Sequence, residues 1–276
     1  MRLLFFVLLI FSFDVQSKIP EPGYGLPELA SEARIKELNS KKRAKVMTPS
    51  VQRKMQRVLE ALDEAGILEQ EQALLKKEKK DKEAEAKDKE IAKAIANGQR
   101  ELDDLKTRLA SLQSYDRSMY YYYSAYYNLA YQDKISEAMN NYVKLVAEKD
   151  TAEKLRVNAY YVLAQLYLSE SNYQSGLDYL LRWFKNTAEV NPDGYVLLGQ
   201  AYYLLADKES TKSKVLASYQ KAYNNMVEAK RLADEKQIRF RENWYSLLLA
   251  SMGELDLKNE QVPCLLYTSD AADEAE

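Results

Sequence analysis

One spacing of tyrosine, leucine and small residues recurs in the second half of the chain, and no other feature restricts the fold as strongly. Its clearest copy consists of Tyr195, Leu198, Gly199 and Tyr202. The copy before it consists of Tyr160, Leu163, Ala164 and Tyr167, which places the two starts 35 residues apart. Positions i, i+3, i+4 and i+7 lie on one face of an α-helix, so the spacing predicts a repeated helical unit. A unit of this length cannot bury its apolar face alone and has to stack on its neighbours.

The spacing matches the first-helix signature of the tetratricopeptide repeat (TPR), a helical hairpin of about 34 residues. A weaker copy precedes the two clear ones, and part of another follows them. The weaker copy comprises Tyr122, Ala125, Tyr126 and Leu129, and the partial one Trp244, Leu247 and Leu248. Second helices are expected around Ala138–Leu145, Gly176–Trp183 and Val215–Ala222. The sequence therefore predicts an all-α fold, a TPR-like α-solenoid of antiparallel helix pairs over 114–263, with about three repeats and the first helix of a fourth.

The segment 48–113 is predicted to form a degenerate helical hairpin in front of the repeats. Thr48-Pro49 is typical of a helix N-cap followed by proline in the first turn, and apolar residues follow at helical spacing from Val51. A second apolar stripe runs from Ile91 to Leu112. Between the two stripes, 76–90 is charged except for two alanines, so it has no apolar face to bury. We expect this charged insertion to lengthen the connection, either as a solvated helix or as a disordered segment.

The first 17 residues have the pattern of a signal peptide. Arg2 is followed by an apolar run from Leu3 to Phe13 and then by small residues, at which an export peptidase would cleave near Ser17. The run is shorter than the roughly 20 residues that a membrane-spanning helix needs, so no stable membrane span is expected. The next segment, 18–47, is rich in Pro and Gly up to Leu29 and is predicted to be flexible.

The last residues, 264–276, contain the only cysteine, Cys264. The string from Cys264 to Glu274 resembles the in-frame translation of an adapter used to prepare sequencing libraries, and it interrupts a helical pattern in the middle of a repeat. We expect this tail to be a sequencing artefact and the native chain to continue past Val262. A genuine acidic tail is the alternative. On the first interpretation, Cys264 says nothing about the redox compartment.

Composition argues against several classes of function. The 276 residues carry a formal net charge of −2, without the basic excess that nucleic-acid phosphates require, so no nucleic-acid partner is expected. The chain has no histidine, which removes the usual general base, the usual zinc ligand and every Ser-His or Cys-His nucleophile pair. We therefore expect no enzyme activity, cofactor, metal site or small-molecule substrate. A carboxylate-dependent hydrolase is a remote alternative, because two acids can catalyse glycoside hydrolysis, but no pair stands out.

Four further motifs lie between about Tyr120 and Gly253. They are Leu163–Tyr167, Arg182–Phe184, Tyr195–Tyr203 and Glu242–Trp244. This stretch is similar to exported TPR proteins of Gram-negative bacteria that are encoded beside TonB-ExbB-ExbD systems. The resemblance implies a periplasmic location and a role as an accessory scaffold in TonB-dependent outer-membrane transport. The alternative is a TPR adaptor in envelope assembly or cell-wall machinery, and gene neighbourhood would separate the two.

The resemblance also implies where a partner would bind, because in repeats of this type the first helices line a concave groove. Ten residues flank the motif on that side. They are Tyr120, Tyr123, Tyr127, Tyr131, Asn158, Tyr161, Gln165, Gln200, Tyr203 and Tyr245. Tyrosine offers a large contact area at small entropic cost, and amides bond to peptide backbone. We expect the partner to be an internal peptide or helix of an envelope protein. The alternative is that helical insertions or the N-terminal hairpin fold over this face and bury the rings.

Overall fold

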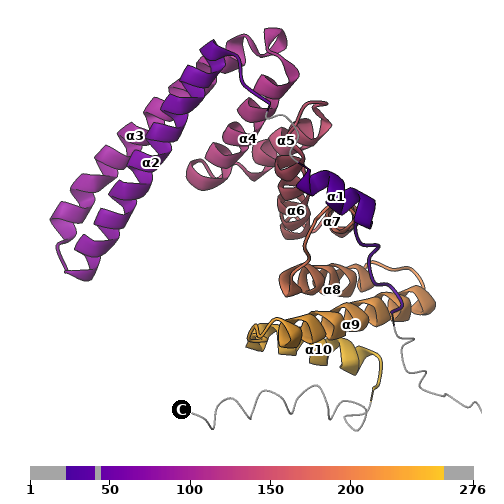
Figure 1. Ribbon diagram of the computed structural model, residues 1–276. Coiled ribbons are helices and arrows are strands. Elements are labelled where there is room, and N and C mark those ends of the chain that lie inside the picture. The colour runs from indigo at the N-terminus through magenta and orange to yellow at the C-terminus, as the bar shows by residue number, and fades with distance from the viewer. Residues whose placement is uncertain (1–22, 41–44, 258–276) are drawn as a thin grey trace, which may run out of the picture. The chain divides into compact units, whose positions relative to one another are not determined.

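The computed structural model describes residues 23–40 and 45–257, and all regular structure in these ranges is helical (Figure 1). The described α-helices are α1 (Glu32–Asn39), α2 (Pro49–Lys77), α3 (Asp81–Thr107), α4 (Ser114–Tyr131), α5 (Ile135–Ala147), α6 (Glu153–Ser169), α7 (Tyr173–Phe184), α8 (Pro192–Ala206), α9 (Lys212–Glu235) and α10 (Glu242–Glu254). A short 3-10 helix, η1 (Leu109–Ser111), follows α3. The signal-peptide and adapter predictions, 1–17 and 264–276, lie outside the described residues.

The chain divides into two compact units, and each is described by itself. Of the described residues, those within 27–190 form the hairpin unit, and 23–26 together with 191–257 form the C-terminal unit. In the hairpin unit α2 packs on α3, α4 on α5 and α6 on α7. In the C-terminal unit α8 packs on α9, and α10 packs against α9. The predicted all-α class is thus confirmed for the described residues, and helices paired in this way are consistent with an α-solenoid.

Small residues allow the paired helices to approach closely, as the repeat pattern predicts. Leu198 and Gly199 of α8 are both buried. A Cβ atom on Gly199 would lie 3.2 Å from the backbone oxygen of Ala222 in α9 and 2.9 Å from the sulfur of Met226. Such contacts are tighter than packed side chains accept, so α8 and α9 can cross at this distance only because position 199 has no side chain.

The hairpin consists of two long helices, α2 and α3, and it differs from the expected insertion. The charged run is helical on both sides of a connection that spans only Glu78–Lys80. Lys, Glu and Ala are strong helix formers, so the run extends both helices and does not lengthen the loop. Lys87 pairs with Glu71 of α2 at 2.9 Å, and Gln72 donates a hydrogen bond to the backbone oxygen of Ala84 at 3.0 Å. Of the two alternatives for this run, the structure therefore shows the helix.

The segment 18–47 also differs from the flexible stretch predicted for it, because it contains α1. Ser31 caps this helix by accepting a hydrogen bond from the N–H of Arg34 at 3.2 Å. The N–H of Ala30 donates to the backbone oxygen of Phe184 at 3.1 Å, and the guanidinium of Arg34 pairs with Glu153 at 2.7 Å. These contacts attach α1 to the α6–α7 pair. Its order comes from partners more than 100 residues away in the sequence, as in the 119-residue separation of Arg34 and Glu153.

A buried carboxylate joins the start of the hairpin to the first helix pair. Thr48-Pro49 begins α2 at the predicted place, but the Thr48 side chain makes no cap bond to its own helix. Its hydroxyl donates to Asp116 of α4 at 2.9 Å, and its backbone N–H donates to the same carboxylate at 3.0 Å. Asp116 is 1% exposed, and a buried carboxylate needs such donors. The bonds therefore fix the beginning of α2 on α4.

A second polar junction connects α4 to the end of α5. Glu148 accepts hydrogen bonds from the Arg117 guanidinium at 2.6 and 2.8 Å and from the Ser114 hydroxyl at 2.8 Å. The bond to Arg117 is the main reason why the pKa of Glu148 lies below its ordinary value of 4.5, and burial acts in the opposite direction. The ionised form of Glu148 thus contributes to stability.

Replacing Glu148 with Gln should lower the free energy of unfolding by about 1 kcal/mol at neutral pH, because charge-assisted hydrogen bonds are roughly twice as strong as neutral ones. A carboxyl group whose folded-state pKa is lowered contributes stability above the unfolded-state pKa, and this contribution is lost as pH falls through the folded-state value. The difference between the parent and Glu148→Gln should therefore be constant above about pH 5 and shrink below 4.5. Urea unfolding across this range measures it. The exposed Glu170 provides the control substitution, and a difference independent of pH would contradict the assignment.

Candidate functional site

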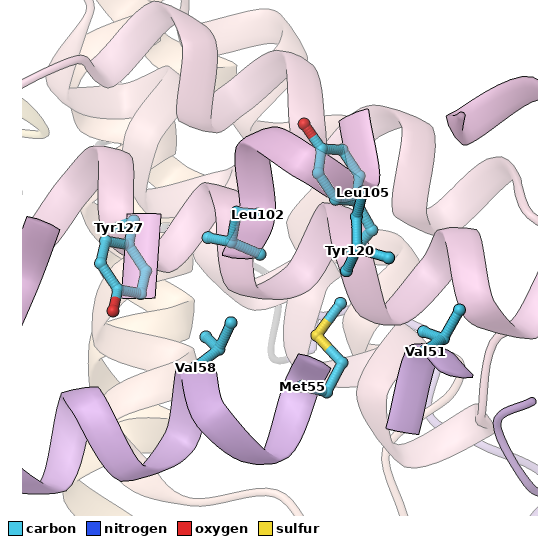
Figure 2. Close-up of a cluster of buried hydrophobic side chains, with 7 residues drawn as sticks. All are labelled: Val51, Met55, Val58, Leu102, Leu105, Tyr120 and Tyr127. Atoms are coloured by element: carbon cyan, nitrogen blue, oxygen red, sulfur yellow. The ribbon is translucent and has the colours of Figure 1, made fainter. Parts of the chain in front are cut away.

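The predicted groove on α4 is occupied by the hairpin. Tyr120 and Tyr127 are 6% and 0% exposed and belong to one buried cluster. Figure 2 shows this cluster, in which the rings from α4 meet side chains of α2 and α3. Its other members are Val51, Met55, Val58, Leu102 and Leu105. The prediction that Tyr120 and Tyr127 face a free groove is wrong, because the apolar stripes of α2 and α3 need a partner and take this face of α4. Tyr123 and Tyr131 are partly buried and pack against the same cluster.

Tyr127 is the most tightly enclosed of these rings. Burial raises its pKa to about 12, and its hydroxyl has no hydrogen-bond partner among the described residues. The ring lies 5.6 Å from that of Tyr131, measured between centroids. The hydroxyl points to Gly98 of α3, where an added Cβ atom would overlap it. Tyr127 therefore acts as a packing residue between α3 and α4.

The residues predicted from the second repeat remain at the surface of α6. Asn158 and Gln165 are exposed, while Tyr161 is half-buried with its ring 5.0 Å from that of Trp183 in α7. Asn158 lines a cavity of about 270 Å³ together with Leu38 of α1 and residues that follow α7. The end of α1 thus covers part of the surface that the repeat pattern assigned to a partner.

The last three predicted residues lie in the C-terminal unit and do not form one cluster there. Gln200 is exposed on α8. Tyr203 packs with its ring 5.2 Å from that of Tyr219, and Tyr245 lies 4.8 Å from Phe240. The ten residues are therefore divided between two units, and the structure brings together mainly the four tyrosines of α4.

A larger cavity, of about 530 Å³, opens in the hairpin unit where α3, α4 and α5 meet. Of the ten predicted residues, Tyr120 alone lines it. Besides Leu109, Tyr120 and Tyr121, the residues that line it have polar or charged side chains. From α3 come Gln99, Asp103 and Lys106. Ser124 and Asn128 belong to α4, and Gln132 follows it. Lys134 precedes α5, which contributes Glu137, Asn140, Asn141 and Lys144. We call this the three-helix cavity.

The three-helix cavity offers hydrogen-bond donors and acceptors side by side. Its lining includes five carboxamides, a group that can both donate and accept, together with three ammonium groups and two carboxylates. The amides of Gln132 and Gln99 bond to each other at 2.9 Å, which joins α3 to the end of α4. The buried hydroxyl of Ser124 has no hydrogen-bond partner among the described residues. An amide-rich wall with one unpaired hydroxyl suits a polar ligand such as a polypeptide backbone.

An aromatic ring contributes to the same wall. Lys144 of α5 places its ammonium 5.8 Å from the ring centroid of Tyr121, within the range of a cation–π contact. Burial and the charge of Glu148 raise the pKa of Tyr121. Sequence reasoning missed Tyr121 because it counted only positions that flank the repeat motif, although its place beside Tyr120 in a run of four tyrosines was a usable signal.

No cluster of three or more Cys, Asp or Glu side chains in the described ranges is placed to hold a metal ion. Among the helices that the structure describes, none combines the length and the apolar character needed to cross a membrane. No protein-family model, curated protein or solved structure matches the chain.

Proposed function

We propose that this protein is an exported adaptor of the TPR type that binds a segment of another envelope protein in the three-helix cavity. The observation that carries the proposal is the cavity itself, because about 530 Å³ lies within the range of ligand sites and its walls present carboxamides, charges of both signs and tyrosine rings. Catalysis would require a group with a distinct chemical role, and binding requires only complementary surfaces. The paired helices of the hairpin unit hold those surfaces in fixed positions.

The chemistry of the cavity favours a peptide backbone over an apolar helix. A backbone presents one N–H donor and one C=O acceptor per residue, and carboxamides such as Asn140 and Gln132 can satisfy both. The excess of ammonium groups over carboxylates, three against two, favours a segment that carries an acidic side chain. The ligand we propose is therefore an internal, polar segment with at least one Asp or Glu.

We further propose that the adaptor works in the periplasm as an accessory of a TonB-ExbB-ExbD system. The support is the signal-peptide pattern of residues 1–17 and the motifs Leu163–Tyr167 and Tyr195–Tyr203, which resemble exported proteins encoded beside such systems. An adaptor in envelope assembly or cell-wall machinery would share the same cavity chemistry. The identity of the captured segment separates these two roles.

Overlapping peptides from the periplasmic parts of the TonB and ExbD proteins encoded nearest to this gene provide the test. We expect at least one acidic peptide to bind the full chain, and binding should weaken at least tenfold in the double variant Lys106→Glu, Lys144→Glu, because two rim charges are reversed. Fluorescence anisotropy measures the affinity. Lys93→Glu, an exposed position of α3 that does not line the cavity, is the matched control.

Two results would count against the proposal. Equal affinity of the parent and the double variant would show that peptides bind elsewhere. Capture of segments from outer-membrane assembly or wall-synthesis proteins alone, with the same dependence on Lys106 and Lys144, would keep the adaptor role and transfer it to the alternative pathway.

A further inference from the structure

The C-terminal unit holds a β-turn formed by its own N-terminal segment. Residues 23–26, Gly-Tyr-Gly-Leu, form this turn, and the N–H of Leu26 closes it by donating to the backbone oxygen of Gly23 at 3.2 Å. Gly25 stands at the third position with a φ of +79°. A type II turn requires positive φ at this position, which glycine adopts without strain. The shape of the turn thus depends on Gly25.

Two consecutive asparagines of α9 bind the middle of the turn. The carboxamide of Asn224 donates to the backbone oxygen of Tyr24 at 2.9 Å, and that of Asn225 donates to the oxygen of Gly25 at 3.1 Å. The central carbonyls of a β-turn have no partner within the turn and need donors from outside. Asparagine is a poor helix former and is seldom buried, yet both asparagines are buried inside α9. The two turn carbonyls give these buried amides acceptors, and Asn225 also donates to the backbone oxygen of Lys221 in its own helix at 2.8 Å.

Lys221, one helical turn earlier, contacts both the tyrosine and the glycine of the turn. Its ammonium lies 5.6 Å from the ring centroid of Tyr24 and 5.2 Å from that of Tyr202 in α8, so it attracts both rings. A Cβ atom on Gly25 would overlap Cγ of Lys221 and lie 2.8 Å from its Cβ. The surface therefore accepts an aromatic residue followed by glycine and rejects a larger residue at the second position.

The turn does not use every contact that this surface offers. Tyr24 remains 40% exposed although it carries the largest side chain of the turn. Asn225 is 0% exposed, and its Oδ1 atom has no hydrogen-bond partner among the described residues. A buried acceptor without a donor is costly, so a ligand that supplies one more N–H would fit better than residues 23–26 do.

We propose that Lys221, Asn224 and Asn225 form a binding site for an aromatic-glycine β-turn on a surface loop of a partner protein, and that residues 23–26 occupy it when the partner is absent. The proposal goes beyond the three-helix cavity, because it assigns a second site to the other unit. A covalently tethered turn has an effective concentration on the order of millimolar for a short flexible tether. A partner loop has to displace it, and the additional N–H donor to Asn225 would favour the partner.

A fluorescein-labelled peptide with the sequence of Pro22–Pro27 tests the site on the full chain. Gly25→Val should release the tethered turn, because it adds a Cβ that overlaps Lys221 and disfavours positive φ. Tyr24→Ser is a milder release variant that removes the ring contact. Both should bind the peptide at least tenfold more tightly than the parent, since the tethered competitor is weakened. Adding Asn225→Ala to either variant should abolish binding.

Peptide variants test the selectivity. A peptide with Gly25→Ala should not bind, whereas one with Gly23→Ala should lose less affinity, because both positions have positive φ but a Cβ at position 23 meets no atom within 4 Å. Equal binding of the peptide to the parent and to both release variants, or binding unchanged by Asn225→Ala, would overturn the proposal. Circular dichroism verifies folding. If Gly25→Val loses helicity, the peptide affinity of Tyr24→Ser is compared with that of the parent instead. The cavity variant Lys106→Glu, Lys144→Glu should leave this binding unchanged, so the two sites are tested separately.

Discussion

Tyr127→Ala should lower the free energy of unfolding of the hairpin unit by about 3–5 kcal/mol, the usual cost of truncating a buried aromatic ring. The ring is 0% exposed and belongs to the cluster formed with α2 and α3. Its removal leaves a cavity beside Val58 and Leu102, and the long helices of the hairpin cannot easily close it. Urea unfolding followed by circular dichroism measures the loss.

The adjacent Tyr126 is the matched control for this prediction. It lies on the same helix but is 42% exposed, so Tyr126→Ala should change stability by less than about 0.5 kcal/mol. If the two variants unfold at the same urea concentration, Tyr127 is not a core residue and the groove on α4 has to be reconsidered.

The helix pairs were predictable because the repeat motif places apolar residues on one face of a helix, and this face packs against the next helix. Leu163 and Leu198 occupy the same motif position, and both are 0% exposed. The spacing does not depend on which distant segment packs nearby, so it can be read from local sequence. The start of α2 was predictable from Pro49, which suits the first turn of a helix, whereas the bonds of Thr48 to the distant Asp116 were not.

The packing of the α2–α3 hairpin on α4 was not predictable from the motif, although the sequence contained a signal for it. Positions Tyr120 and Tyr127 are seven residues apart and share a face, but periodicity alone cannot say whether that face meets a ligand or another helix. The signal was the apolar stripe that includes Val51 and Met55, because a hairpin with such a stripe can pack on an aromatic face. This is the alternative stated with the groove prediction, in which the N-terminal hairpin folds over the face and buries the rings.

The three-helix cavity and the turn-binding residues escaped prediction for a different reason. Asn140 looks like any surface residue until α3 forms a wall opposite it, and that wall comes from a distant part of the sequence. Asn224 and Asn225 were more visible. They follow the predicted second helix Val215–Ala222 and lie in the middle of α9, where two consecutive poor helix formers indicate side chains that are retained for their hydrogen bonds.

Gly98→Ala should lower stability by about 2 kcal/mol, although alanine is normally the better helix former by roughly 1 kcal/mol. The added Cβ atom would overlap the hydroxyl of Tyr127 and lie 2.8 Å from its Cζ atom, and overpacking of this kind costs about 1–3 kcal/mol or more. Gly66 of α2 provides the matched control. A Cβ atom there meets no atom within 4 Å, so Gly66→Ala should stabilise the hairpin by about 0.5–1 kcal/mol.

Combining Gly98→Ala with Tyr127→Phe tests whether the hydroxyl is the atom in conflict. Tyr127→Phe alone should be at least as stable as the parent, because it removes a buried hydroxyl that has no hydrogen-bond partner among the described residues. In the Tyr127→Phe background Gly98→Ala should cost about 1 kcal/mol less than in the parent, since the closest contact, to the hydroxyl, is gone and those to the ring carbon at 2.8 Å and the Ala61 Cβ at 3.1 Å remain. Effects that simply add would show that α3 and α4 do not meet through this pair, and the hairpin would then have to contact α4 by another part of its surface.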